Sequence, residues 1–237
     1  MPSGLVEINK DKEVKFKGYV TAPASGVYPG VLLLHQEFGI DANIRSMAEL
    51  CAAKGYTVFV PDLFWRELPG CELNSNKKDD LEQASKLVEG YNIDKGYEDV
   101  VSCLQWLRET PQCNGLVTTI GYGIGANLSY LSGLWLDIES SVCYDFDGIN
   151  FFQDHDTFIR RPMLIHLCKR IYKDLKDSDK LKFLDNVNNI KLNVYEKCEK
   201  NFTRISDKHF NESEALNSQQ KTFTHILEAF KNPHTHS

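Results

Sequence analysis

The chain has 237 residues, of which 42% are hydrophobic and 25% charged, a composition typical of a globular protein that excludes a disordered or collagen-like chain. The formal net charge of −6 leaves no basic excess for phosphates, and no apolar run approaches 18 residues. We therefore expect no nucleic-acid binding and no direct membrane insertion. Seven single cysteines without a C-x-x-C pair, and a start without a signal peptide, predict reduced and mostly buried thiols in a cytoplasmic protein.

Short apolar strands alternate with amphipathic helices along the chain, after an edge hairpin in the first twenty residues. Buried strands are predicted over residues 30–35, 57–64, 116–123, 140–146, 161–168 and 191–197. Helices are predicted over residues 41–54, 77–91, 97–109, 127–136 and 219–230. This alternation predicts an α/β fold with a doubly wound, mostly parallel sheet. No linker divides the chain, so we expect one domain over 1–237, with a disordered tail over 231–237.

A glycine-rich turn joins the predicted strand 116–123 to the helix that follows it. Gly121, Gly123 and Gly125 match the nucleophile elbow, G-x-nucleophile-x-G, which makes a sharp turn from strand to helix. The middle position normally holds serine or cysteine, and here it is Gly123. Such a turn could instead hold a phosphate, but it lacks the lysine and the serine or threonine of a P-loop.

The surroundings of this turn resemble the dienelactone hydrolase family. The resemblance runs from about residue 20 to residue 230 and is carried by residues 35–64, 67–70, 120–131 and 162–164. It implies an α/β-hydrolase fold and a Cys-His-Asp triad.

Carried over residue by residue, the family's catalytic positions hold other residues in this chain. The nucleophile position holds Gly123, the acid position Ile171 and the base position Lys200. A family glutamate near the nucleophile is replaced by Gln36. Triad chemistry needs a nucleophile, a base and an orienting acid, so the resemblance implies a member without a working triad.

Four further residues are candidate ligand contacts, together with Gln36. Arg204 lies four residues after the base position, where the family can hold an arginine that grips a substrate carboxylate; a solvated arginine is the alternative. Cys168 and Cys198 flank the acid and base positions and could supply a relocated nucleophile, although small core thiols are the simpler interpretation. His35 lies near the carboxyl end of a strand, where α/β sheets place ligands. No H-x-x-x-H or C-x-x-C spacing suggests a metal, and we expect neither a metal nor a cofactor.

Three functions remain open from the sequence. The favoured hypothesis is a catalytically silent hydrolase fold that acts as a binding or adaptor subunit of a larger protein assembly. The alternatives are a triad-independent enzyme, such as an isomerase or epimerase, and a small-molecule binding protein that uses the old hydrolase pocket. We expect a protein partner of unknown identity, or a homodimer, and absence of enzymatic activity is the favoured outcome.

Overall fold

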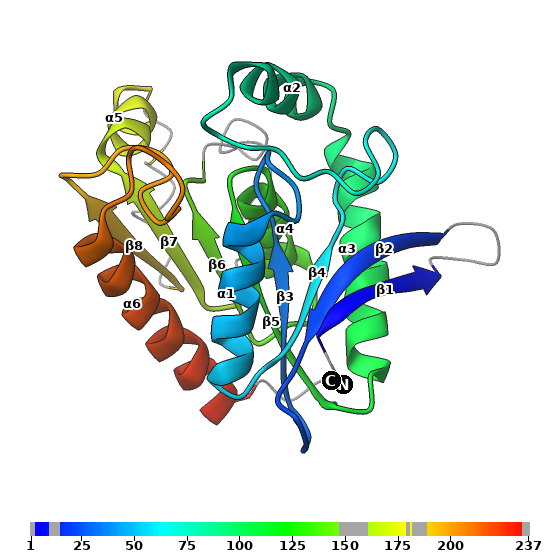
Figure 1. Cartoon of the computed structure of the whole chain (residues 1–237). Coiled ribbons are helices and arrows are strands. Elements are labelled where there is room, and N and C mark those ends of the chain that lie inside the picture. Colours follow the sequence, from blue (N-terminus) through cyan, green and yellow to red (C-terminus); the bar gives the residue numbers. More distant parts are fainter. Residues whose placement is uncertain (1–2, 10–14, 147–160, 179–180, 182–188, 234–237) are drawn as a thin grey trace.

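A computed structural model describes residues 3–9, 15–146, 161–178, 181 and 189–233 (Figure 1). Its strands are β1 (Gly4–Asn9), β2 (Lys15–Thr21), β3 (Tyr28–Leu34), β4 (Thr57–Pro61), β5 (Cys113–Tyr122), β6 (Ser140–Tyr144), β7 (Met163–Cys168) and β8 (Ile190–Tyr195). Its helices are α1 (Ala42–Ala53), α2 (Lys78–Glu89), α3 (Ile93–Glu109), α4 (Ile124–Trp135), α5 (Lys169–Asp177) and α6 (Glu212–Lys231). None of these described helices is long and apolar enough to cross a bilayer.

The strands of the described chain form one sheet in the order β1-β2-β4-β3-β5-β6-β7-β8. The pairs from β4 to β8 are parallel, whereas β1 and β2 join the edge antiparallel. The predicted α/β fold with a doubly wound, mostly parallel sheet is therefore confirmed. Because the parallel strands point the same way, their carboxyl ends meet at one edge of the sheet, where such folds bind ligands.

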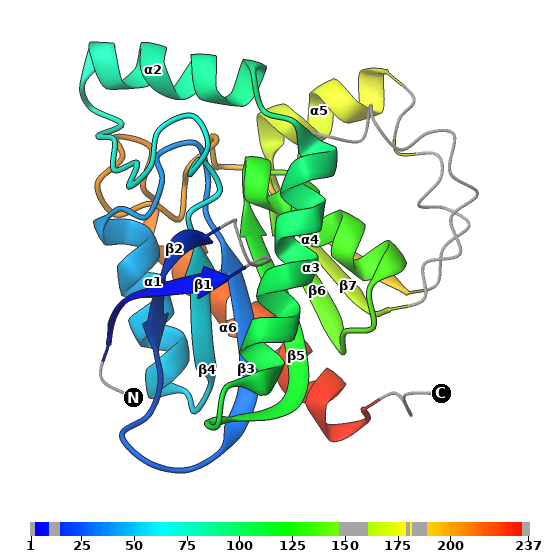
Figure 2. The same cartoon turned by 90° about the vertical axis from the view of Figure 1, so that its right-hand side faces the viewer.

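Helices cover both faces of the sheet, because side chains alternate between the faces along each strand. On one face, Val31 and Val58 pack with Ile44 of α1 and Ile226 of α6. On the other face, strand side chains pack against residues of α3 and α4. Figure 2 shows these two helices lying against the sheet. In contrast, α2 lies across the carboxyl-end edge of the sheet, above the strand tips (Figures 1 and 2).

The C-terminal helix begins earlier than its apolar pattern predicts. We expected a helix from residue 219, but α6 starts at Glu212. The side chain of Asn211 accepts the backbone N–H of Glu214, which caps the helix, and the small residues Ala215 and Ser218 are buried. Lys231 ends this helix, and residues 234–237 of the expected tail lie outside the described residues.

The helix α5 follows β7 directly and was not predicted. Its residues Ile171 and Leu175, four positions apart, are buried against the sheet. Ile171, at the position where the resemblance places the acid, is therefore a core residue.

Candidate active site at the elbow

The elbow has the predicted place in the fold. Gly123 stands alone between β5 and α4 with φ 52° and ψ −117°, a conformation that residues with a Cβ adopt only with strain. The neighbouring glycines allow tight packing, because a Cβ on Gly121 would lie 2.1 Å from the carbonyl oxygen of Gly125. The turn places the start of α4 at the carboxyl edge of the sheet.

A carboxylate occupies the space beside Gly123 where a nucleophile would begin. A Cβ built on Gly123 would lie 2.8 Å from Oε2 of Glu37 and 3.3 Å from Cβ of Gln36. Nζ of Lys200 lies 3.4 Å from Oε1 of Glu37, and their side chains are 39% and 14% exposed. The positions that the resemblance assigns to the nucleophile and the base are thus brought together, with Glu37 between them.

A second carboxylate anchors the turn that carries Lys200. Asp145 follows β6, is buried, and accepts the N–H of Asn201 at 2.9 Å and, at 3.4 Å, that of Cys168. Asp145 and Asn201, with φ of 52° and 71°, are the non-glycine residues with positive φ in the described part of the chain. Backbone in this region is held only where the surroundings impose it, so this hydrogen bond ties the end of β6 to the Lys200 turn.

Burial raises the pKa of Asp145 to about 6, because the charged carboxylate loses water. The hydrogen bond from Asn201 and the positive charge of Lys200 act in the opposite direction on this pKa. Asp145 therefore changes charge near pH 6, in the site that also holds the ion pair of Glu37 with Lys200.

A cavity of about 250 Å³ opens beside Glu37 and Lys200. Its other lining residues come from the loop after β3, from α2 and from α4: Phe38, Leu81, Ala84, Ser85, Val88, Ile124 and Asn127. One end of this cavity is charged and the wall formed by α2 is largely apolar.

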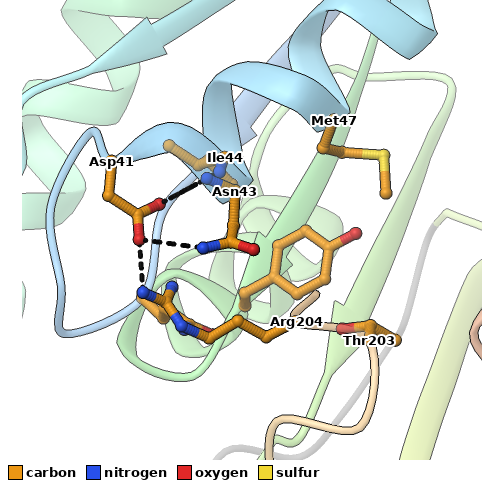
Figure 3. Close-up of a pocket in the computed structure, with 8 residues that line it drawn as sticks. Asp41, Asn43, Ile44, Met47, Thr203 and Arg204 are labelled. Carbon is orange, nitrogen blue, oxygen red and sulfur yellow. Dashed lines mark hydrogen bonds and ion pairs between the residues drawn. The ribbon is translucent and has the colours of Figure 1, made fainter. Parts of the chain in front are cut away.

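Arg204 lies in a separate, smaller pocket of about 40 Å³ (Figure 3). Its buried guanidinium pairs with Asp41, donates to Oγ of Ser75 at 3.3 Å and covers the ring of Phe38 at 4.4 Å. Asp41 also caps α1 by accepting the N–H of Ile44 at 3.1 Å. The carboxylate-binding role of Arg204 stays a prediction, but its charge is already balanced by Asp41 and it does not line the larger cavity.

His35 holds two loops together beneath the site. The N–H of Leu63 donates to its Nε2 at 3.0 Å, so Nδ1 carries the proton and donates to the carbonyl of Gln36 at 2.7 Å. Burial lowers the pKa of His35 to about 4, which keeps the ring neutral. Both ring nitrogens are used within the protein. The ligand role expected of Gln36 stays a prediction; its side chain lines the smaller pocket beside Arg204.

The cysteines near the site do not favour a relocated nucleophile. All seven cysteines are free and buried, as expected. Burial raises the pKa of Cys168 to about 12 and that of Cys198 to about 11, whereas the thiolate is the reactive form. Both belong to the core cluster around Ile171. Within the described residues, no group of three His, Cys, Asp or Glu side chains is arranged to hold a metal ion.

Comparison with known proteins identifies the family. A model of the dienelactone hydrolase family matches residues 16–232. The chain belongs to the dienelactone hydrolase family. Carboxymethylenebutenolidase 1 of Cupriavidus pinatubonensis is 29% identical over 167 residues, which are 70% of this chain and 71% of the relative. Carboxymethylenebutenolidase of Pseudomonas putida is 27% identical over 152 residues, 64% of each chain.

Solved structures of dienelactone hydrolase type share the fold. A putative dienelactone hydrolase from Klebsiella pneumoniae superposes with a TM-score of 0.75 at 14% identity, covering 96% of this chain and 99% of its own. A dienelactone hydrolase from Anabaena variabilis gives a TM-score of 0.69 at 16% identity, covering 96% of this chain and 97% of its own.

These relatives overturn the expected function. The sequence favoured a catalytically silent adaptor, with an isomerase, an epimerase or a small-molecule carrier as alternatives. The family is one of hydrolases, and these relatives are named as hydrolytic enzymes, none of them as an adaptor. The adaptor hypothesis is therefore wrong on this comparison. It rested on the four family positions that hold Gly123, Ile171, Lys200 and Gln36 in this chain.

Proposed function

We propose that this protein hydrolyses small esters or lactones, with the Glu37 carboxylate activating water in place of a covalent nucleophile. The observation that carries the proposal is the position of Glu37, whose Oε2 would lie 2.8 Å from a Cβ on Gly123. The Glu37 carboxylate therefore lies at the place from which attack on the carbonyl carbon of a bound substrate would begin. On this proposal the reaction runs without a Cys-His-Asp triad.

The proposed reaction balances without a further reagent. Glu37 takes a proton from water as the hydroxyl oxygen bonds to the substrate carbonyl carbon, which yields a tetrahedral oxyanion. The oxyanion is stabilised by the backbone N–H of Ile124, at the start of α4, and by an N–H of the loop after β3, as this fold provides. The intermediate then collapses, the alcohol oxygen leaves, and Glu37 returns the proton to it.

Lys200 supplies the positive charge in this scheme. Its ammonium lies 3.4 Å from Glu37, where it keeps the carboxylate in place and faces the developing negative charge. Asp145 acts through Lys200, because it fixes the following residue, Asn201, by a hydrogen bond of 2.9 Å. Asp145 is thus a positioning residue.

The test compares Glu37→Gln with the wild type in the hydrolysis of p-nitrophenyl acetate. We expect saturable hydrolysis by the wild type, and a loss of about 100-fold or more in kcat/KM in the variant, since glutamine cannot accept the proton. Glu82→Gln, on the exposed side of α2, is the matched control and should leave the rate unchanged. Equal rates for wild type and Glu37→Gln, or no wild-type rate above buffer, would refute the proposal.

A further inference from the structure

A groove of about 660 Å³ lies between α6 and β8, away from the elbow. Figure 1 shows this helix running beside β8, the last strand of the sheet. The groove reaches down to the buried Leu164 of β7, and side chains of β8 and α6 form its walls. It shares no lining residue with the cavity beside Glu37 and Lys200. Its volume falls within the roughly 300–1,000 Å³ of small-molecule sites, so it is a candidate binding site of its own.

Lys221 brings an unbalanced positive charge to this groove. Its ammonium donates to Oδ1 of Asn193 at 2.9 Å and lies 5.3 Å from the centre of the Tyr195 ring, and no carboxylate pairs with it among the described residues. The side chain is half-buried. After burial itself, the charge of Lys221 is the next cause that lowers the pKa of His166, to about 3. A cation that is partly withdrawn from water without a counter-ion favours the binding of an anion.

The other charged side chains of the groove balance one another. Lys191 and Glu228 pair at 3.3 Å, and Glu228 is the single carboxylate among the described lining residues. Burial lowers the pKa of His225 to about 4, which keeps this ring neutral at physiological pH. The lining therefore carries one net positive charge, and it resides on Lys221.

The amide of Asn193 places a hydrogen-bond donor beside this charge. An ammonium can only donate, so Lys221 holds the amide with its oxygen towards Nζ and leaves the amide nitrogen for another partner. That nitrogen has no hydrogen-bond partner in the described part of the chain, and it is not enclosed by protein. An ammonium next to amide N–H groups suits a carboxylate, which accepts charge-assisted hydrogen bonds from both.

The exposed wall of the groove is polar and uncharged. Gln220 and Thr224 lie one helical turn apart on α6, and both line the groove. The hydroxyl of Thr224 donates to the carbonyl of Gln220 at 2.9 Å, so its oxygen still accepts. A hydrocarbon would take water away from these groups without replacing its hydrogen bonds, whereas hydroxyl groups replace them.

We propose that the groove between α6 and β8 binds a small hydroxylated organic acid with a single carboxylate, such as a sugar acid. The carboxylate pairs with Lys221 and accepts from the amide of Asn193, and the hydroxyl groups contact Gln220 and Thr224. One unbalanced cation matches one negative charge, which favours a carboxylate over a doubly charged phosphate. This binding is separate from the proposed hydrolysis at the elbow.

Three probes with the same number of carbon atoms test the proposal, and ligand-observed NMR at low ionic strength measures their binding. Gluconate has a carboxylate and hydroxyls, hexanoate has the carboxylate alone, and sorbitol has hydroxyls alone. Gluconate should bind tightest. Hexanoate should be about threefold to tenfold weaker, because it lacks neutral hydrogen bonds, and sorbitol about tenfold or more weaker, because it lacks charge-assisted ones. Inorganic phosphate should also bind more weakly than gluconate.

Lysine variants locate the anion in this groove. Lys221→Met keeps an unbranched side chain without the charge, and it should weaken gluconate binding about tenfold or more. Lys231→Met, at the exposed end of the same helix, loses the same charge outside the groove and should bind gluconate as the wild type does. Lys200→Met removes the cation of the elbow and should also leave gluconate binding unchanged.

Asn193→Asp tests the same contact without removing a side chain. The new carboxylate gives Lys221 a counter-ion within the protein and repels a bound acid, so gluconate binding should be lost. Its resistance to urea should stay equal or rise, because Lys221 gains a partner. Loss of binding in this variant therefore cannot be ascribed to unfolding.

The proposal is overturned if any other probe binds as tightly as gluconate, if no probe binds, or if Lys221→Met keeps the wild-type affinity. Loss of gluconate binding in Lys200→Met would place the anion at the elbow and overturn it as well. Should Lys221→Met fail to fold, Asn193→Asp and the ranking of the probes still decide. None of these measurements involves hydrolysis, so their outcome is independent of that of Glu37→Gln.

Discussion

At the scale of single residues, the elbow depends on a backbone conformation that residues with a Cβ adopt only with strain. Gly123 has φ 52°, and a Cβ there would lie 2.8 Å from Glu37. The glycine therefore does two things: it relieves the strain of the elbow and it leaves room for the carboxylate. A nucleophile at 123 and the present position of Glu37 exclude each other.

The Gly123→Ala variant should lose both stability and hydrolysis. Strain at positive φ lowers the free energy of unfolding by about 1–3 kcal/mol, and the new methyl group displaces the Glu37 carboxylate. Gly70→Ala is the matched control, since Gly70 also has positive φ but nothing within 4 Å of an added Cβ. Urea unfolding should show a loss in both variants, and the p-nitrophenyl acetate assay a loss in Gly123→Ala alone. Retained hydrolysis in Gly123→Ala would mean that Glu37 need not lie at the elbow.

Asp145→Asn should remove a contribution that makes stability fall as the pH rises. Because the buried histidines act in the opposite direction, the net gain in stability from pH 4.5 to 7.5 should be larger in the variant than in the wild type. The folded pKa of Asp145 is raised to about 6 from 3.8, so its contribution to stability is complete below pH 4 and is lost as the pH rises through 6. Between pH 4.5 and 7.5 this loss amounts to about 2 kcal/mol, and asparagine does not titrate.

Urea unfolding of both proteins at the two pH values measures this difference. Asp79→Asn, an exposed residue of α2, should behave as the wild type. The same change of stability with pH in the wild type and in Asp145→Asn would show that Asp145 does not carry this titration.

The sequence predicted which positions come together at the site better than it predicted the chemical roles of their side chains. Gly123 and Lys200 were named, and the structure brings both to Glu37. Glu37 was missed because the resemblance aligned the neighbouring Gln36 with the family glutamate. Asp145 was missed because the acid was sought after β7, at Ile171, whereas contact with Asn201 depends on β6 and β8 ending at the same edge. Such contacts between distant segments leave no local pattern to find.

At the scale of elements, helix starts depend on caps more than on apolar periodicity. The predicted α3 and α6 both began too late, at residues 97 and 219. In the structure Asn92 and Asn211 cap these helices, and each accepts an N–H of the first turn. Strands were easier, since runs of mostly apolar residues mark β4 and β7 directly. The amphipathic α5 was missed because it is short and mostly polar.

Asn211→Ala should shorten α6 and lower the free energy of unfolding by about 1 kcal/mol, because the N–H of Glu214 loses its acceptor. Asn211→Asp keeps a carboxylate oxygen at the cap and should retain wild-type stability. Urea unfolding followed by far-ultraviolet circular dichroism measures both variants. If alanine and aspartate behave alike, packing of Ala215 and Ser218, and not the cap, sets the start of the helix.

At the scale of the whole molecule, we expect three buried histidines to lower stability in acid. Burial lowers the pKa of His35 and His225 to about 4 and that of His166 to about 3. His166 is enclosed by the hydroxyls of Tyr195, at 2.8 Å, and Thr222, at 3.1 Å. In the unfolded chain, each exposed histidine ring takes up a proton as the pH falls below about 6.5. In the folded chain, burial keeps all three rings neutral at pH values at which exposed rings are already charged.

Stability should therefore fall as the pH drops below 6.5. The three histidines release protons on folding, while Asp145, with its raised pKa, takes one up, which leaves a net uptake of about two protons on unfolding near pH 5. Urea unfolding at intervals from pH 7 to pH 4.5 gives this number from the slope. His225→Gln should reduce the slope by about one proton, and an unchanged slope in that variant would contradict the assignment.

The seven buried cysteines make the rate of thiol modification depend on how often the fold opens. All seven thiols are enclosed, and they are distributed over α1, α3, the strands β5, β6 and β7, and loops near the site. An alkylating reagent or an oxidant reaches a buried thiol only during an opening event, so each reaction rate reports how often that part of the molecule opens. Cys143 in the inner strand β6 should report the rarest, global openings, and Cys198 those of the loop that leads to Lys200. The reaction rates of the seven thiols should therefore differ, and a thiol resists oxidation only as well as the segment around it resists opening.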